Sequence, residues 1–183
     1  KEVDRNRIGI LGICGWGGMA LNAASMDTRV KAVATSVMYD MSRAMGHGVG
    51  DGKDRYSTSD RRAVLQYLNA QRWKDAENGT FAHGGHDIYV DENGKVTAAE
   101  RILPEALPDN PNPVLKEFFD YYRMPRGFHA RSVNSTGAWT ATTPLSFMNM
   151  PLLSYGREIT IPTLIVTGEK AHSRYFAEDA FKA

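Results

Sequence analysis

A strand, a glycine-rich turn, a helix and a second strand follow one another near the N-terminus, and this order constrains the fold more than any other feature. Residues 8–13 form a short apolar, β-branched run that is typical of a strand buried on both faces. Small residues from 17 to 24 suit a helix packed closely on a sheet, and residues 30–37 form a second apolar run. Such a βαβ unit predicts two parallel strands. A third run of this kind occurs only at residues 163–167.

The chain between the second and third predicted strands lacks the regular alternation of strand and helix patterns that is typical of a parallel sheet. In its first part, Ser59 can cap a helix that ends at Gly79. An insertion of this length between two sheet strands is most simply a cap over the carboxyl edge of the sheet. We therefore expect an α/β fold in which residues 1–45 and 158–183 form an incomplete parallel core and residues 46–157 form a large, mainly helical cap.

Composition excludes several classes of function. The formal net charge of +1 argues against a nucleic-acid partner. The longest apolar-plus-glycine run, residues 8–21, is shorter than the roughly 20 residues that cross a bilayer, so we expect no transmembrane helix. One cysteine allows neither an intramolecular disulfide nor a multi-cysteine zinc site. Two histidines and an aspartate fall within residues 83–87, but this glycine-containing loop has no partnering cluster. We expect no metal and no cofactor.

The turn after the first predicted strand, residues 12–18, carries the residues best placed for chemistry, and we call it the elbow. A sharp strand-to-helix turn can lift one side chain above a sheet, which is where Cys14 lies. A helix N-terminus would lower the pKa of the Cys14 thiol and favour the reactive thiolate, and the Gly15 N–H would point at a developing oxyanion. The alternative is that Cys14 is an inert, buried thiol.

The elbow and several later segments resemble the α/β-hydrolase superfamily, and most closely its dienelactone-hydrolase-like branch, in which a cysteine can replace the usual serine. The matching segments are residues 7–18, 37–41, 126–129, 139–148 and 161–176. The resemblance implies a hydrolase acting on a small ester-, lactone- or thioester-like substrate through Cys14. Trp16 stands where the usual elbow has a glycine. Aligning Gly17 and Gly18 with the usual glycine pair would instead put Gly15 at the nucleophile position and leave no nucleophile.

The resemblance also implies an acid after the third strand and a histidine later in the chain. Glu169 is our first candidate for the acid, because the aspartate that is common at this turn is missing. Asp40, after the second strand, is the alternative acid or a helix cap. His172 is a surrogate base, a cap-contacting residue or a structural loop residue. The residues expected to line a pocket, unless they belong to plain core or cap packing, are Trp16, His129 and Trp139.

Three functions compete on these observations. The first is a cysteine-dependent hydrolase with a small-molecule substrate. The second is a catalytically inactive relative that binds a small molecule or a protein, and the third is an assembly role for the aromatic-rich cap. Three predicted strands are fewer than this superfamily needs, so we expect the chain to be the middle of a longer protein. We also expect a cytoplasmic location for the chain. Its open sheet edges would be covered in a homo-oligomer or by a complementing chain segment.

Overall fold

The computed structural model describes residues 2–50, 52–85 and 87–183, which form two compact units. The first unit combines Lys1–Arg55 with Phe147–Ala183, and the second is Tyr56–Ser146. The insertion expected from the sequence, residues 46–157, is longer at both ends than the second unit. Its role as a cap stays a prediction.

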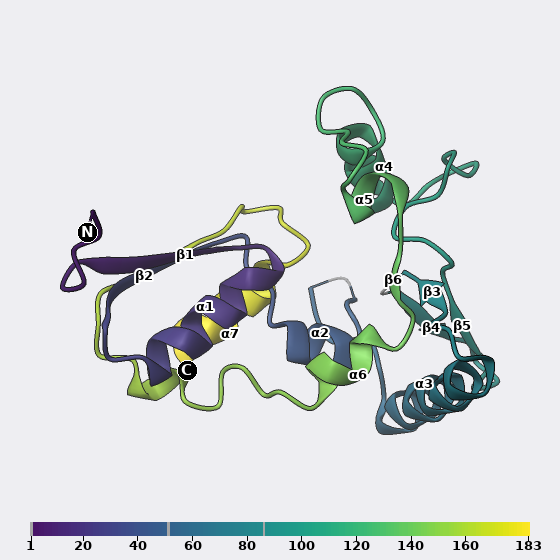
Figure 1. The fold of residues 1–183 in the computed structure, drawn as a ribbon, viewed down its shortest axis with the longest axis horizontal. Coiled ribbons are helices and arrows are strands. Elements are labelled where there is room, and N and C mark those ends of the chain that lie inside the picture. The colour runs from purple at the N-terminus through teal and green to yellow at the C-terminus, as the bar shows by residue number, and fades with distance from the viewer. Residues whose placement is uncertain (1, 51, 86) are drawn as a thin grey trace. The chain divides into compact units, whose positions relative to one another are not determined.

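The first unit is built on a three-stranded parallel sheet (Figure 1). The strands are β1 (Ile8–Ile13), β2 (Val30–Ser36) and β7 (Thr163–Val166), in the order β1-β2-β7. Helix α1 (Gly15–Met26) connects β1 to β2, and both strand pairs are parallel. The predicted α/β class and the parallel βαβ unit are therefore confirmed.

One face of this sheet packs against α1 and α7 (Arg174–Lys182). The small residues of α1 let it approach the strands closely, and the apolar side chains between the layers are removed from water. The fully buried members of this core are Ala20, Leu21, Val33, Met38 and Ala177.

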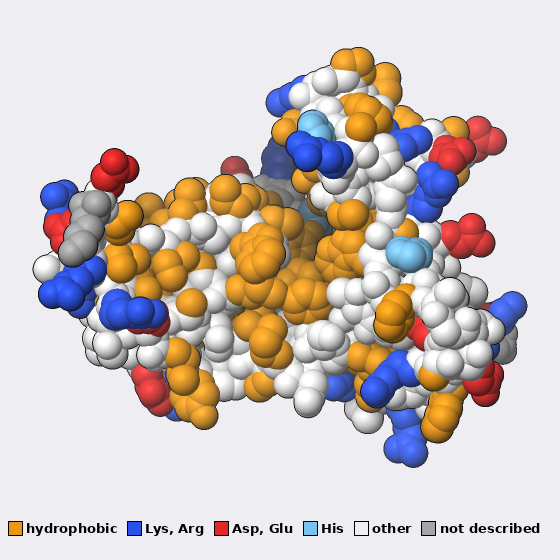
Figure 2. Space-filling view, in the orientation of Figure 1, with side chains coloured by type: hydrophobic (Ala, Val, Ile, Leu, Met, Phe, Trp, Pro, Cys, Tyr) orange, Lys and Arg blue, Asp and Glu red, His pale blue; other side chains and the backbone are white. Residues whose placement is uncertain are grey.

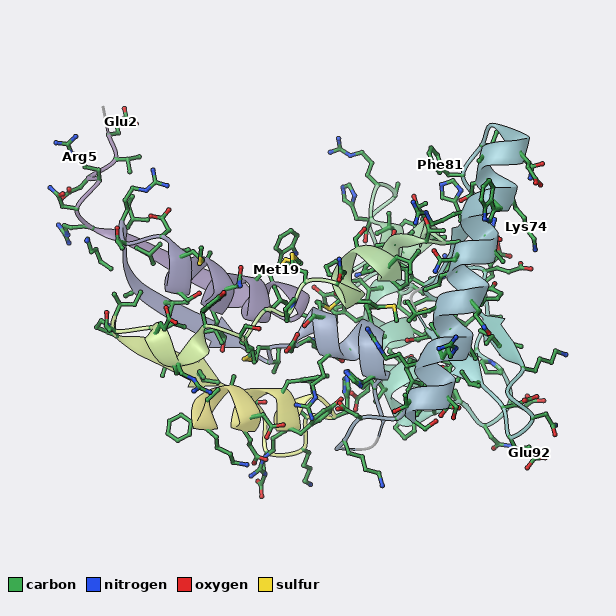
Figure 3. All side chains as sticks on the ribbon, turned by 90° about the horizontal axis from the view of Figure 1, so that it is seen from below. Glu2, Arg5, Met19, Lys74, Phe81 and Glu92 are labelled. Carbon is green, nitrogen blue, oxygen red and sulfur yellow. The ribbon has the colours of Figure 1, made fainter. Side chains whose placement is uncertain are left out.

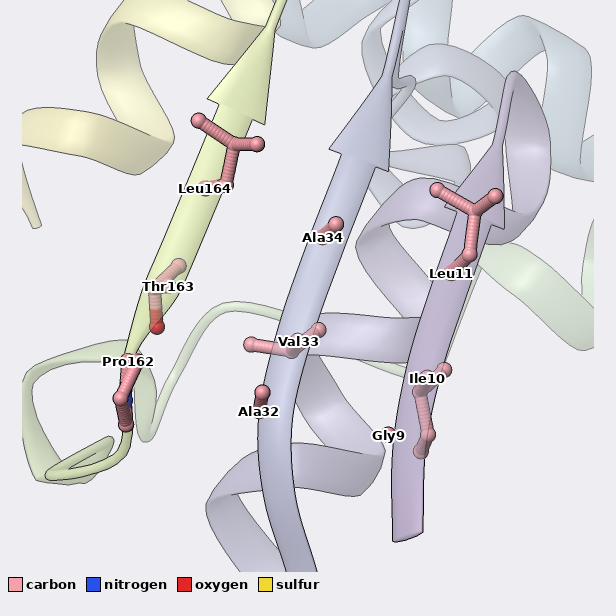
Figure 4. Close-up of a pocket in the computed structure, with 9 residues that line it drawn as sticks. All are labelled: Gly9, Ile10, Leu11, Ala32, Val33, Ala34, Pro162, Thr163 and Leu164. Atoms are coloured by element: carbon pink, nitrogen blue, oxygen red, sulfur yellow. The ribbon is translucent and has the colours of Figure 1, made fainter. Parts of the chain in front are cut away.

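The opposite face of the sheet is bare among the described residues. Leu11 and Ile13 of β1 are 63% and 54% exposed, and Leu164 of β7 is 60% exposed. Figure 4 shows Leu11, Ala34 and Leu164 side by side on the three strands, where they help to line a shallow apolar hollow. Hydrophobic side chains also gather over this unit in Figure 2. The prediction that β1 is buried on both faces is thus wrong, because the helices of this unit cover one face only.

Arg43 ties three parts of the first unit together. It lies on α2 (Met41–His47), and its guanidinium bonds Asp54 at 2.8 Å and Asp179 of α7 at 2.6 Å. The same guanidinium lies 5.2 Å from the centre of the Tyr175 ring, which is cation–π distance. Removing it would take this partner from both carboxylates and leave Asp179 with the more distant Lys182, at 3.7 Å.

We predict that Arg43→Met lowers the free energy of unfolding by about 2 kcal/mol, since hydrogen bonds to charged groups contribute that much. The matched control is Arg29→Met, which removes an exposed pair with Asp27 and should leave stability unchanged. Urea denaturation of both variants measures the difference. Equal stability of the two variants would contradict this role of Arg43.

The second unit begins with the long helix α3 (Thr58–Asn78). Ser57 and Asp60 form a capping box, in which each side chain accepts the other residue's backbone N–H, and Gly79 ends the helix in the left-handed conformation at φ 64°. The predicted end is confirmed. The predicted cap at Ser59 is wrong by two residues, because Ser57 has the acidic partner three positions later.

Short elements complete the second unit. They are β3 (His83–Gly84), β4 (Ile88–Val90), β5 (Val96–Ala98), α4 (Pro113–Tyr122), α5 (Val133–Thr136) and β6 (Trp139–Thr140). Helix α6 (Thr143–Met148) begins in the second unit and ends in the first, which also holds the 3-10 turn η1 (Gly156–Glu158). Strands β3 and β6 pair antiparallel, as do β4 and β5. Glu92 projects from the turn between β4 and β5 (Figure 3). Over the described ranges, no helix has the length and apolar character needed to cross a bilayer.

Candidate active site

Cys14 adopts a backbone conformation that residues other than glycine rarely adopt. Between β1 and α1 it has φ 56° and ψ −126°, a conformation that costs on the order of 1–3 kcal/mol. Three backbone hydrogen bonds hold it: the Cys14 N–H donates to Ser36 at 3.0 Å, and the Cys14 carbonyl accepts from Gly17 at 3.0 Å and Tyr39 at 2.9 Å. The strain is therefore maintained by the ends of two neighbouring strands and the first turn of α1.

The glycines of the elbow are required by close packing. A Cβ on Gly12 would lie 2.5 Å from the Trp16 carbonyl oxygen, and one on Gly17 would lie 2.3 Å from the Met38 Cβ. The segment that follows β2 thus approaches α1 most closely at Gly17, three residues after Cys14. Trp16, at the usual glycine position, projects outward and is 70% exposed. The positive φ falls on Cys14 and not on Gly15, which matches a turn centred on Cys14.

We predict that Gly17→Ala destabilises the fold by about 1–2 kcal/mol, because an overpacking cost of about 2–3 kcal/mol exceeds the gain of about 1 kcal/mol from replacing a helical glycine by alanine. Gly9→Ala is the matched control, since its new Cβ would meet nothing closer than 3.6 Å. Chemical denaturation compares the two. A Gly17→Ala protein as stable as the Gly9→Ala protein would show that this contact relaxes without cost.

The Cys14 thiol is protonated at neutral pH. Solvent reaches the side chain, yet the surrounding protein desolvates the sulfur and raises the pKa of the Cys14 thiol, and the Gly15 N–H opposes this by a smaller amount. The expectation of a lowered pKa is wrong, because desolvation of the sulfur exceeds the effect of the Gly15 N–H. A thiol of this kind needs a proton acceptor before it can attack a carbonyl.

The two carboxylates expected as the acid lie in different surroundings. Glu169 is exposed, and its carboxylate bonds no histidine among the described residues. Asp40 is buried and caps α2, accepting from the Ser42 hydroxyl and from the Arg43 N–H at 3.1 Å. The geometry thus gives Asp40 a capping role. The assignment of Glu169 as the acid stays a prediction.

Tyr39 and His172 form a hydrogen-bonded pair at the carboxyl edge of the sheet. The Tyr39 hydroxyl bonds His172 Nε2, and the centres of their rings lie 5.7 Å apart. The segment before Tyr39 is also tied to β7, since the Val37 N–H donates to the Val166 carbonyl at 2.8 Å. The ends of all three strands therefore meet, as expected for a parallel sheet. Tyr39 was missed in the sequence, although its place directly after the second strand was the available signal.

The remaining predicted site residues are placed as follows. His129 belongs to the second unit, is exposed, and accepts the Arg131 N–H on its Nδ1 at 3.2 Å. Trp139, also in the second unit, is half-buried on β6. Pocket roles for these two residues and for Trp16 stay predictions.

His86, of the loop considered for a metal, lies outside the described residues. The described part of the chain holds no group of three acidic, histidine or cysteine side chains that fits a metal ion.

The fold and the elbow define a mixed α/β protein with a strained cysteine turn, and comparison with known proteins finds relatives that align with nearly the whole chain. The protein named "Uncharacterized protein PA2218", from Pseudomonas aeruginosa, is 50% identical over 183 residues, which is 100% of this chain and 44% of the relative. The protein named "Uncharacterized protein YcjY", from Escherichia coli strain K12, is 24% identical over 180 residues, which is 98% of this chain and 52% of the relative.

The same fold is found in a solved structure. The crystal structure of the hypothetical protein PA2218 matches with a TM-score of 0.83 and 49% sequence identity, over 99% of this chain and 50% of that chain. No known protein-family model matches the sequence. The chain spans about half the length of the relatives it matches.

Proposed function

We propose that this chain carries the nucleophile elbow of a cysteine-dependent hydrolase of the α/β superfamily, with small ester-, lactone- or thioester-like substrates. The observation that carries the proposal is the positive φ of Cys14 at the junction of β1 and α1. A strained turn between a parallel strand and its helix is the feature by which such enzymes present a nucleophile. Strain of this kind persists where the surrounding structure enforces it, and it clusters at functional sites.

The proposed reaction has two steps. Cys14 Sγ forms a bond to the substrate carbonyl carbon, the carbonyl oxygen becomes an oxyanion near the Gly15 N–H, and the alcohol or thiol leaves with a proton. Water then attacks the thioester on Cys14 and releases the acid. The Gly15 N–H is the first N–H of α1 after Cys14, and it acts on the thiol to lower its pKa.

The alternative is an inactive relative that binds a small molecule or a protein. It is favoured by one observation: among the described residues, neither candidate carboxylate bonds a histidine. A usual triad built on Asp40 or Glu169 therefore does not form in the described part of the chain. The two functions differ in whether Cys14 is ever acylated.

Acylation of Cys14 is the test of the proposal. The protein is incubated with a panel of chromogenic esters and thioesters, quenched in acid, and its intact mass is measured. We predict an added acyl mass and release of chromophore, both absent in Cys14→Ala. Because the chain has one cysteine, a thiol adduct has only one place to form.

The matched control is Met26→Ala, an exposed substitution at the far end of α1, which should acylate at the wild-type rate. An unmodified wild-type mass with every ester and thioester would overturn the hydrolase and favour the binding function. Turnover that persists in Cys14→Ala would place the chemistry elsewhere.

A further inference from the structure

The second unit carries a surface segment that is rich in arginine and aromatic residues. It comprises residues 121–131, the end of α4 and the turn that follows, and we call it the arginine turn. It contains three arginines, two tyrosines, a phenylalanine, a methionine and a histidine, and no aspartate or glutamate occurs from residue 121 to residue 157. Figure 2 shows basic and hydrophobic side chains together over α4 and α5. The segment is therefore both cationic and partly apolar.

The backbone of the arginine turn is held by its own hydrogen bonds. The Gly127 N–H donates to the Tyr121 carbonyl at 3.1 Å, and the Phe128 N–H donates to the Met124 carbonyl at 3.1 Å. The Tyr121 ring lies directly on Gly127, since a Cβ there would be 2.5 Å from the ring carbon Cε1. The turn therefore presents its side chains in a fixed arrangement, which lowers the entropy cost of binding a partner.

Two of the three arginines in the turn have no anionic partner. Arg123 is half-buried, and its guanidinium donates to two backbone carbonyls of the same unit. Arg126 is exposed, and its guanidinium lies 5.7 Å from the centre of the Tyr121 ring, at cation–π distance. Arg131 is exposed as well, and among the described residues no carboxylate pairs with the guanidinium of Arg126 or Arg131. Both cations are therefore available to an anion.

Apolar and aromatic side chains accompany the two arginines. Tyr121, Met124 and Phe128 are 44%, 47% and 46% exposed. Tyrosine, phenylalanine, methionine and arginine are enriched at protein interfaces, whereas lysine, aspartate and glutamate are depleted there. The arginine turn contains none of these three depleted residue types. Its composition therefore favours a protein partner over a small anion, and the formal net charge of +1 argues against nucleic acid.

We propose that the arginine turn is a docking surface for an acidic segment of a protein partner. Carboxylates of the partner pair with the guanidinium groups of Arg126 and Arg131, whose planar forks fit a carboxylate through two parallel hydrogen bonds. Apolar side chains of the partner cover Met124 and Phe128. Charge complementarity selects an acidic partner, because the turn presents cations and no acid. The inference goes beyond the proposed function, since it concerns the second unit and does not depend on Cys14.

The probe is a fluorescein-labelled peptide in which glutamates alternate with leucines, and its binding to the full chain is measured by fluorescence anisotropy. A matched peptide has glutamine in place of every glutamate. We predict that the wild-type protein binds the acidic peptide roughly tenfold or more tightly than the glutamine peptide, because hydrogen bonds to charged groups contribute that much. Added salt should narrow this difference, since it screens exposed charges.

Variants assign the binding to the arginine turn. Arg126→Gln and Arg131→Gln each remove one cation and should weaken binding of the acidic peptide by roughly tenfold, while Phe128→Ala should weaken it by roughly fivefold or more. Arg62→Gln, exposed on α3, is the matched control, because it removes the same charge from the same unit and should keep the wild-type affinity. Circular dichroism checks that each variant is folded.

Several outcomes would overturn the docking surface. They are a wild-type protein that binds neither peptide or binds both equally, an Arg131→Gln protein with wild-type affinity, and an Arg62→Gln protein that loses as much as Arg126→Gln. Citrate or single-stranded polyuridylate that displaces the peptide and binds more tightly would overturn the protein partner in favour of a small anion or nucleic acid. Acylation of Cys14 enters none of these outcomes, so the hydrolase and the docking surface stand or fall separately.

Discussion

The left-handed backbone at Cys14 is the constraint on which the site depends. It exists because the cysteine carbonyl is bound by two N–H groups and because the segment after β2 approaches α1 so closely that Gly17 admits no side chain. These contacts fix the position of Tyr39, whose hydroxyl reaches His172. The strained turn, the close helix packing and the tyrosine–histidine pair are therefore parts of one arrangement.

The sequence predicts the framework of this arrangement well, because the framework is local. The apolar runs, the elbow glycines and the helix stop at Gly79 are properties of neighbouring residues, and they predict the parallel unit and the end of α3. Whether one or both faces of the sheet are covered is not a property of neighbouring residues. The same apolar pattern in β1 fits a strand with one or two covered faces, so the exposure of Leu11 could not be predicted.

The chemistry of the site was harder to predict because it depends on competing energies. A helix N-terminus and an N–H lower the pKa of a thiol, while desolvation raises it, and only the structure shows that desolvation is larger at Cys14. Asp40 likewise fits both an acid and a cap in the sequence, and its contacts with Ser42 and Arg43 identify the cap. The place of Tyr39 after the second strand was a signal in the sequence, but its partner His172 lies far along the chain and is identified by the structure.

The central claim is that Cys14 is placed to attack a carbonyl carbon. Carbon NMR with a small aldehyde labelled at its carbonyl carbon tests this most directly, because attack by sulfur converts a trigonal carbon into a tetrahedral one bonded to sulfur. The account predicts a hemithioacetal signal in the wild-type protein that is absent in Cys14→Ala. A spectrum that shows only the free aldehyde and its hydrate, as in buffer, would contradict it.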